Sequence, residues 1–333
     1  MPLPFSVQFI PVENISALES DENVLAAIRY ASIASKENTK KPLFSVGLPN
    51  LALSNVVEVW YSDAPVQTTA INGIQISFND DVLFGHLLLD ETNYDDIVSA
   101  TEDAYRSILD TIQTLGYPCV LRIWNYFSSI NEDQEGLERY KKFCLGRQQT
   151  LDQFGVFVDS PPAATAIGTS GGGLQVYFIA AKEAGIQLEN PRQTSAFLYP
   201  EQYGSARPAF SRATVKKWQD TTHLYISGTA SIVGHETRHI GQVVKQLEET
   251  LENIEALVQY GADTQDLPIN GLTDLSYLKV YLRDLFMLSI TEELLIRRYG
   301  HNLPTVLFLH GDVCRADLLV EIEAAYILND ADI

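Results

Sequence analysis

The sequence predicts an α+β fold in which two similar β-α-β-α-β-β units follow one another in one chain. Two stretches repeat the same order of strand-like and helix-like apolar patterns, which is the main evidence for a duplication. The length of 333 residues suits two domains, and a composition of 46% hydrophobic and 20% charged residues is typical of folded proteins. We therefore expect two pseudo-symmetric domains, 1–185 and 220–333, joined by a connector over 186–219.

The N-terminal extension, residues 1–80, lies outside this repeat. The pattern predicts one helix over Glu22–Ser35 and one strand over Val56–Tyr61. Nothing in this segment indicates a function.

The first unit begins with a strand and closes with two short strands. Its first helix has apolar residues at helical spacing and is followed by Gly116 and Pro118, a usual helix stop. The predicted elements are strand Asp81–Asp90, helix Asp95–Leu115, strand Cys119–Phe127, helix Gln134–Gln153, and strands Ala164–Gly168 and Leu174–Ala181.

The second unit repeats this order. Its first helix is amphipathic, and we expect it to stop at Gly261. The predicted elements are strand His223–Ala230, helix Gly241–Tyr260, strand Tyr277–Leu282, helix Ser289–Tyr299, and strands Thr305–His310 and Leu318–Tyr326.

Between the units, Glu189–Ala213 is a long segment without a regular pattern. It contains three prolines, two tyrosines and three arginines. Loops of this length are usually disordered or functional, and aromatic residues with prolines favour an ordered one. We expect this connector to contribute to a binding site.

The charge and the cysteines exclude several classes of protein. A net charge of −20 without a basic run argues against nucleic-acid binding. No apolar run approaches the roughly 20 residues of a membrane span, and the first residues do not form a secretory signal. Three cysteines at unrelated spacings favour a reducing compartment, so we expect a cytoplasmic protein. An anionic substrate would require arginines gathered locally.

The segment His235–His239 fits the zinc motif H-E-x-x-H. Two histidines bind zinc in this motif only when a helix places them on one face. Gly234 and the strand before it put the segment in a loop instead, and no suitable third ligand follows. We therefore interpret these residues as polar flanks of a helix and expect no metal.

Ordered motifs in the second unit resemble the YjgF/RidA family, whose fold is also called chorismate-mutase-like. The resemblance covers about 220–328 and rests on Ser227–Ala230, Gln246, Asn253, Pro304 and Val320–Glu323. The arginine with which the imine deaminases of that family bind a carboxylate has no match, because Val306 and Leu307 occupy its neighbourhood. An imine hydrolase or a small-molecule sensor therefore remains an alternative but is disfavoured.

From about residue 56 to the end, the chain is similar to the chorismatases, and specifically to their 3-hydroxybenzoate synthase branch. The resemblance implies a lyase that releases pyruvate from chorismate, needs no cofactor, and has a fold like the deaminase trimer built within one chain. Eight motifs occur in the family's order: Trp124–Tyr126, Arg139-Tyr140 with Phe143 and Gly146-Arg147, Ala163–Gly168, Glu189–Gln193, Tyr199-Pro200 with Tyr203-Gly204, Arg212-Ala213, Ser227–Ala230 with Gly234-His235, and Cys314–Glu321.

The resemblance makes Glu321 the general acid that protonates the enolpyruvyl methylene of chorismate. A carboxyl in a partly apolar site has the raised pKa that this step requires. Strand alternation places Glu321 and Glu323 on one face and Val320 and Ile322 on the other. The two substrate carboxylates call for guanidinium partners. The candidates are Arg147, Arg192, Arg212 and Arg283, with the hydroxyls of Tyr199 and Tyr203; Arg315 is a weaker candidate that we expect at a solvent-facing hairpin.

Two small residues, Gly228 and Cys314, match the branch of the family that aromatises the ring. The absence of a methyl group at Gly228 gives the ring room to react with its own hydroxyl, and Cys314 stabilises or deprotonates an intermediate. The alternatives are hydrolysis to 3,4-dihydroxycyclohexa-1,5-dienoate and a mixture of 3- and 4-hydroxybenzoate. Because an internally repeated chain can close its own interface, we expect a monomer.

Overall fold

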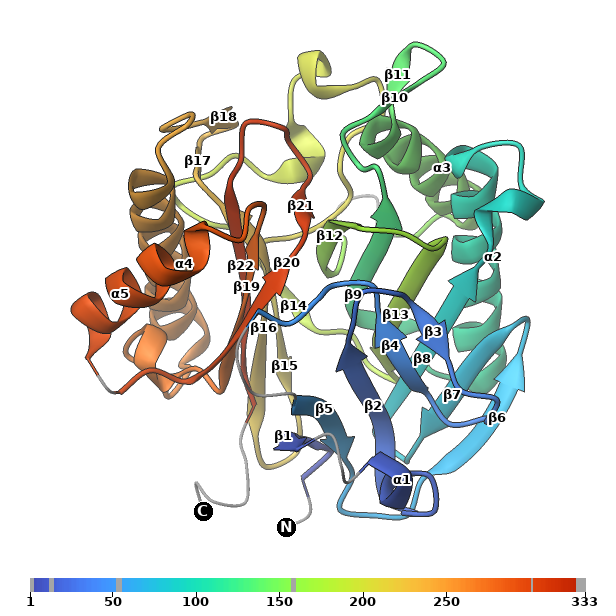
Figure 1. Cartoon of the computed structure of the whole chain (residues 1–333). Helices are drawn as coiled ribbons and strands as arrows, with labels where there is room; N and C mark the ends of the chain where they lie inside the picture. Colours follow the sequence, from blue (N-terminus) through green and yellow to red (C-terminus); the bar gives the residue numbers. More distant parts are fainter. Residues whose placement is uncertain (1–2, 12–14, 52–55, 157–159, 301, 328–333) are drawn as a thin grey trace.

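Three β-sheets meet at the centre of this protein, and its long helices lie on the outside (Figure 1). The structure is a computed structural model that describes residues 3–11, 15–51, 56–156, 160–300 and 302–327. In that part of the chain, none of the helices combines the length and the apolar character of a membrane span.

The first unit forms a seven-stranded sheet of order β21-β12-β9-β13-β8-β7-β6, with α2 and α3 on its outer face. Helix α2 starts with a capping box between Asp96 and Ser99 and ends at Gly116, which adopts the left-handed conformation. The elements are β6 Gln67–Ile71, β7 Ile74–Phe78, β8 Val82–Leu89, α2 Ile97–Leu115, β9 Cys119–Ser128, β10 Asp133–Gln134, β11 Leu137–Glu138, α3 Arg139–Phe154, β12 Ala163–Thr169 and β13 Leu174–Ala181.

The second unit forms a six-stranded sheet of order β14-β15-β16-β22-β19-β20, covered by α4 and α5. Its short strand β21 leaves this sheet and pairs with β12, so the hairpin before β22 is tied to the first unit. The elements are β14 Ile186–Leu188, β15 Ala213–Lys217, β16 Thr222–Ala230, β17 Ile232–Val233, β18 Glu236–Thr237, α4 Val243–Gln265, β19 Tyr277–Leu282, α5 Met287–Tyr299, β20 Thr305–His310, β21 Asp312–Val313 and β22 Val320–Tyr326.

The two sheets have the same topology. The order β12-β9-β13-β8-β7-β6 in the first corresponds strand for strand to β20-β19-β22-β16-β15-β14 in the second. The parallel pair β9/β12 corresponds to the parallel pair β19/β20, and the flanking pairs are antiparallel in both. The prediction of an α+β chain with two pseudo-symmetric β-α-β-α-β-β units is confirmed.

Several predicted boundaries need correction. Helix α3 begins at Arg139 and not at Gln134, because Glu135 and Gly136 have positive φ and form the β10–β11 turn. Helix α4 continues past Gly261 to Gln265, because Gly261 does not adopt the positive φ of a helix stop; instead it is a place where the side chains of Leu188 and Leu267 approach the helix closely. The segment 186–219, predicted as a connector, contains β14 and β15.

Residues 6–61 of the N-terminal extension form a third sheet of order β1-β5-β2-β4-β3, whereas β6 and β7, also predicted to lie outside the repeat, join the first sheet. Strands β4-β2-β5-β1 of the third sheet follow the same order and pairing as β12-β9-β13-β8, so it is a third, helix-poor copy of the unit. The elements are β1 Ser6–Pro11, α1 Ile15–Leu18, β2 Val24–Tyr30, β3 Ser35–Lys36, β4 Leu43–Val46 and β5 Val56–Tyr61.

The helix predicted over Glu22–Ser35 is wrong, whereas the strand over Val56–Tyr61 is confirmed. Strand β2 lies between β5 and β4 and is buried along nearly its whole length. A short apolar run buried on both faces has no alternation by which it can be distinguished from a helix.

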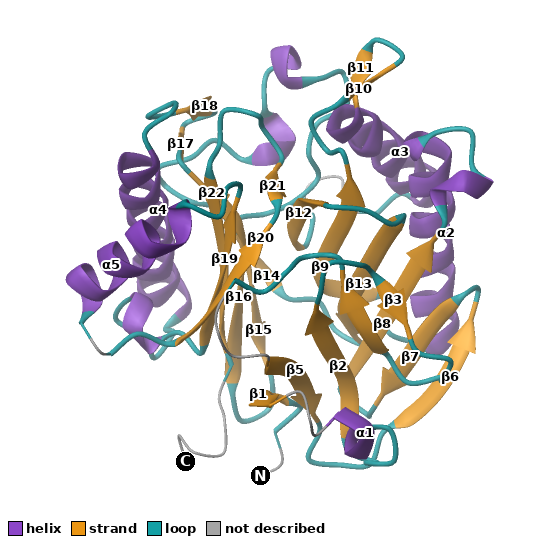
Figure 2. Ribbon diagram, in the orientation of Figure 1, coloured by secondary structure: helices purple, strands orange, loops and turns teal. Residues whose placement is uncertain are grey.

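The three sheets converge at the centre of the molecule (Figure 2). The side chains of their inner faces pack together in an aromatic core. The largest buried side chains there include Trp60 from the third sheet, Trp124 and Tyr177 from the first, and Tyr225 and Tyr281 from the second. The outer faces of the first and second sheets pack separately against their own helices. Polar side chains on the inner faces therefore lie deep in the molecule, where three units converge.

Candidate active site

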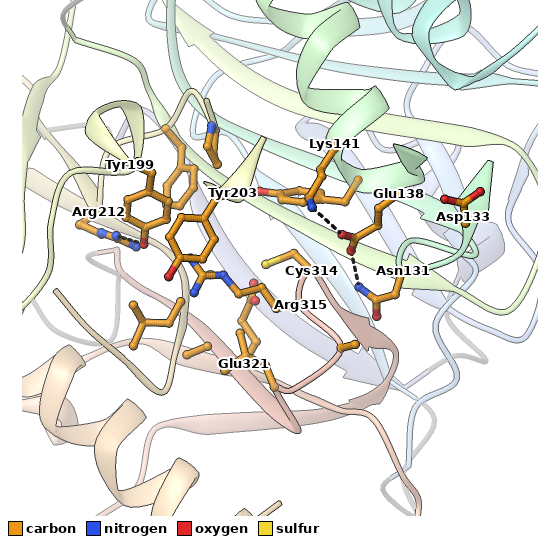
Figure 3. Close-up of a pocket in the computed structure, with 18 residues that line it drawn as sticks. Asn131, Asp133, Glu138, Lys141, Tyr199, Tyr203, Arg212, Cys314, Arg315 and Glu321 are labelled. Atoms are coloured by element: carbon orange, nitrogen blue, oxygen red, sulfur yellow. Dashed lines mark hydrogen bonds and ion pairs between the residues drawn. The ribbon is translucent and has the colours of Figure 1, made fainter. Parts of the chain in front are cut away.

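A cavity of about 300 Å³ lies between the first and second units, beneath the connector (Figure 3). It adjoins a smaller compartment of about 30 Å³ on the side of α3 and β12. Residues from both units and from the connector line the main cavity: Asn131, Asp133, Glu138, Tyr140, Lys141, Tyr199, Tyr203, Pro208, Phe210, Arg212, Gly228, Ala230, Ile232, Cys314, Arg315, Ala316, Leu318 and Glu321.

Glu321 lines both compartments from strand β22 and is only 4% exposed. The alternation of the strand turns Glu321 and Glu323 to the inner face, while Val320 and Ile322 pack toward the helices. Burial, and then the nearby Glu323 carboxylate, raise the pKa of Glu321 from its ordinary value of 4.5 to about 8, against the opposing effect of Arg122 and Arg212. This carboxyl therefore carries a proton at neutral pH.

The carboxyl of Glu323, two residues along the same strand, is in the opposite protonation state: it is ionised. Its carboxylate lies 2.9 Å from Arg122 and 3.3 Å from Lys279. It also accepts hydrogen bonds from Trp124 Nε1 at 2.7 Å and from the Thr165 hydroxyl at 2.7 Å. Burial acts to raise the pKa of Glu323, but Lys279 and Arg122 outweigh it and hold the pKa below the ordinary value.

Environments that push two neighbouring carboxyls toward opposite protonation states are typical of acid–base sites. The structure thus provides a proton donor beside a fixed negative charge.

The carboxyl of Glu321 leaves no room for a side chain at Gly228. Gly228 lies in a bulge of β16 opposite β22, and its N–H donates to the Thr165 hydroxyl at 3.0 Å. A Cβ at this position would be 1.9 Å from Glu321 Oε1, so a methyl group here displaces the acid itself. The predicted effect of Gly228 on space for the ring therefore acts through the Glu321 side chain.

Arg212, with Tyr199 and Tyr203, forms the wall of the cavity on the connector side (Figure 3). The Arg212 guanidinium is 2% exposed and donates to the carbonyl of Thr194 at 2.8 Å and to the Tyr199 hydroxyl at 2.7 Å, while its Nε has no partner. The Tyr203 hydroxyl lies 3.1 Å from Nδ1 of His235. These side chains hold a buried cation at the cavity wall with one donor unused.

Arg147 lines the smaller compartment and is 3% exposed. Its guanidinium lies over the Phe143 ring and near Cys144, with no ion pair among the described residues and no partner for Nε. A buried guanidinium without a carboxylate is a strong binding group for an anion.

Two predicted binding residues do not line the cavity. Arg192 pairs with Glu249 at 2.6 Å and Glu252 at 3.1 Å on helix α4. Arg283 donates to the carbonyls of Val313, Arg315 and Leu318 and pairs with Asp312. The structure thus places Arg192 at the base of the connector and Arg283 inside the hairpin before β22, where each supports the backbone.

Arg315 is a cavity residue that sequence analysis placed at a solvent-facing hairpin. Its guanidinium lies 4.1 Å from the centre of the Tyr203 ring and 5.3 Å from that of Tyr199, and it donates to the carbonyl of His235 at 2.9 Å. Lys141 and Asn131 were also missed, because the β10–β11 hairpin and the start of α3 reach the site only through the packing of the two units. Tyr140, by contrast, belongs to a motif that the resemblance had already singled out.

Cys314 lines both compartments next to Glu321. Burial, and then the Glu321 carboxyl, raise the pKa of its thiol well above the ordinary value. Cys314 is therefore an uncharged thiol at neutral pH and can donate a weak hydrogen bond.

The H-E-x-x-H segment forms the β17–β18 hairpin and the turn after it. His235 contacts Tyr203, whereas His239 lies 3.2 Å from Glu249. The two imidazoles do not share a helix face, and the described part of the chain contains no group of three or more residues suited to bind a metal.

The architecture and the cavity together define an α+β protein with a buried, protonated carboxyl and buried guanidinium groups at the junction of two repeated units. A family model described as "Chorismatase FkbO/Hyg5-like, N-terminal" matches residues 58–180. The chain is 36% identical to a chorismatase from Streptomyces rapamycinicus, over 96% of this chain and 98% of that protein. It is 35% identical to a 3-hydroxybenzoate synthase from Streptomyces hygroscopicus, over 90% of this chain and 91% of that protein.

A chorismatase crystal structure superposes with a TM-score of 0.89 at 33% identity, covering 98% of this chain and 99% of that one. The structure of RidA from an Antarctic Psychrobacter bacterium is similar over 39% of this chain, with a TM-score of 0.30 and 22% identity. The chain belongs to the chorismatase family, as the eight ordered motifs predicted.

Proposed function

We propose that this enzyme converts chorismate to 3-hydroxybenzoate and pyruvate, with Glu321 as the general acid. The observation that carries the proposal is the buried carboxyl of Glu321, whose pKa of about 8 leaves it protonated at neutral pH beside guanidinium groups that can bind a dianion. An ordinary carboxyl with a pKa of 4.5 would hold a proton in only about one molecule in three hundred at pH 7.

In the proposed reaction, Glu321 gives its proton to the enolpyruvyl methylene, which becomes a methyl group and leaves positive charge on the carbon that bears the ether oxygen. The bond between that oxygen and the ring then breaks, and its electron pair completes the carbonyl of pyruvate. The ring, attacked by its own hydroxyl, loses a proton and becomes aromatic. The atoms of chorismate are thus divided between hydroxybenzoate and pyruvate, and no water is consumed.

The two carboxylates of chorismate would bind the guanidinium groups of Arg212 and Arg147, with Arg315 and the two connector tyrosines completing the cavity wall. The ionised Glu323 beside the acid favours return of a proton to Glu321 after each turnover. Arg192 and Arg283 would act only by holding the backbone of the connector and of the hairpin.

The choice of 3-hydroxybenzoate rests on Gly228 and Cys314, both of which face Glu321 in the cavity. The 35% identity to a 3-hydroxybenzoate synthase supports the same product. Hydrolysis to 3,4-dihydroxycyclohexa-1,5-dienoate and mixed formation of 3- and 4-hydroxybenzoate are the competing outcomes.

The test is to incubate the protein with chorismate and to follow pyruvate enzymatically and the ring products by chromatography. We expect equal amounts of pyruvate and 3-hydroxybenzoate. Glu321→Gln should abolish turnover while the circular dichroism spectrum stays unchanged, and an active variant would remove Glu321 as the acid. The absence of any chorismate turnover would refute the proposal and favour a RidA-like imine hydrolase or a sensor.

Product control is tested separately with the double variant Gly228→Ala/Cys314→Val. The added methyl group meets the Glu321 carboxyl, and the thiol is replaced by an apolar group of similar size. We expect the product ratio to move toward the dihydroxy acid. Unchanged output of 3-hydroxybenzoate would refute the role of these two positions.

A further inference from the structure

A buried lysine lies where the three units converge. Lys279 on β19 is fully buried, and its ammonium lies 2.9 Å from Glu58 Oε2, 3.3 Å from Glu323 Oε1 and 3.4 Å from the Tyr177 hydroxyl. Glu58, Tyr177 and Glu323 sit on β5, β13 and β22, which are the equivalent strands of the three sheets. One ammonium therefore joins all three copies of the unit at their pseudo-symmetry axis.

Among the residues that the structure describes, none of the third unit lines either compartment, yet this unit supplies one of the four charges of the cluster. Glu58 is fully buried, and its carboxylate also accepts hydrogen bonds from Tyr30 and from Trp60 Nε1. A charge placed this deep is costly unless it is paired, and pairing with Lys279 is what the structure provides.

The charges of the cluster cancel. Lys279 and Arg122 carry two positive charges, and Glu58 and Glu323 carry two negative ones. Because each of the two cations already contacts a carboxylate, the cluster has no net positive charge that would stabilise the ionised form of Glu321. Without Glu58, the ammonium of Lys279 would have only Glu323 as a counter-ion, and the cluster would carry a net positive charge next to the acid.

We propose that Glu58 is a positioning residue of the active site, which keeps the proton on Glu321 at neutral pH by neutralising Lys279. This inference rests on the proposed role of Glu321 as the acid. It assigns to the N-terminal unit an electrostatic part in a reaction whose substrate that unit does not touch.

Other groups also face the two carboxyls, but Glu58→Gln changes none of them. Around Glu321 these are Glu323 on its own strand, Arg122 on β9, Tyr140 and Arg147 on α3, Arg212 at the end of the connector, and Cys314 and Arg315 in the hairpin. Around Glu58 they are Trp60 on its own strand, Tyr30 on β2, Tyr177 on β13, and Tyr277 and Lys279 on β19.

The experiment compares the pH dependence of kcat/KM for chorismate in the parent and in Glu58→Gln. Activity should fall at high pH as Glu321 loses its proton. Removing one charge from a buried cluster that contacts the neighbouring Glu323 carboxylate should move this loss of activity to lower pH by roughly one pH unit, about tenfold in the protonation constant. The matched control is Tyr30→Phe, which removes a hydrogen bond to Glu58 but no charge, and which should leave the fall in place.

A second variant tests the opposite sign. Lys279→Met removes a positive charge, so kcat/KM should fall at a higher pH than in the parent. In the double variant Glu58→Gln/Lys279→Met, this pH should return to near the parent value. A readout without activity is the infrared band of the protonated Glu321 carboxyl, assigned by its loss in Glu321→Gln and titrated in each variant.

The inference would be overturned if the pKa of Glu321 were the same in Glu58→Gln as in the parent, or if Tyr30→Phe shifted this pKa as much as Glu58→Gln does. Either result would leave the proposed function intact. If Glu58→Gln does not fold, Lys279→Met provides the test. The inference is then overturned if the pKa of Glu321 is not higher in Lys279→Met than in the parent. A parent enzyme that fails to turn over chorismate contradicts the proposed function instead, and the infrared titration still decides the electrostatic role of Glu58.

Discussion

Replacing the acid should make this protein more stable, and the gain should grow with pH. Glu321 is buried, and its pKa of about 8 lies above the ordinary value of 4.5 that it regains on unfolding. Between these two values the folded protein keeps a proton that the unfolded chain has released. Stability therefore falls as pH rises through this interval, because folding must take up the proton. Glu321→Gln cannot ionise and avoids this loss.

The magnitude follows from the two pKa values. Each pH unit corresponds to about 1.4 kcal/mol, so the interval from 4.5 to about 8 corresponds to about 5 kcal/mol at most. From about pH 5 to pH 8, the free energy of unfolding of Glu321→Gln should rise relative to the parent by about 4 kcal/mol. Above the upper pKa the difference should stay constant.

Urea denaturation of the parent and of Glu321→Gln at several pH values measures this difference. Glu323→Gln is the control on the same strand, because the pKa of Glu323 is held below the ordinary value and its carboxylate stabilises the fold above pH 4.5. That variant should be less stable than the parent by about 3–5 kcal/mol at neutral pH, with no gain as pH rises. A difference between Glu321→Gln and the parent that does not change with pH would refute the raised pKa of Glu321.

Three further predictions concern residues around the site. Arg212→Lys should raise KM for chorismate at least about tenfold, because an ammonium cannot replace the planar set of donors at the cavity wall. Arg192→Lys, outside the cavity, should change KM by less than about twofold. Equal effects of the two substitutions would contradict the placement of these side chains. Cys314 should react with iodoacetamide at least about ten times more slowly in the native protein than in urea, because burial raises the pKa of the thiol. Mass spectrometry of its peptide measures both rates, and equal rates would contradict the raised pKa. Arg283→Met should lower the free energy of unfolding by about 2–4 kcal/mol, since three carbonyls of the hairpin lose their donor, and unchanged stability would show that the hairpin holds without it.

Much of the fold was predictable because local patterns dominate it. The strands and helices of both units have clear periodicity, and their identical order predicted the duplication that the two sheets display. The third unit was missed because β2 is buried on both faces and its sheet has almost no helix to reveal the repeat. The alternation of β22 correctly placed Glu321 and Glu323 on one face and Val320 and Ile322 on the other.

The sequence by itself determined the family and the two repeated units, and it singled out Glu321 on β22 as the candidate acid. It did not determine which arginines face the cavity. Arg192 and Arg283 are held by partners up to 61 and 152 residues away along the chain, while Arg315 turns inward onto Tyr203. The protonation of Glu321 was likewise decided only by the tertiary structure. A pKa depends on burial and on charges brought together in space, and here those charges come from Glu323 on β22, Arg122 on β9 and Arg212 at the end of the connector.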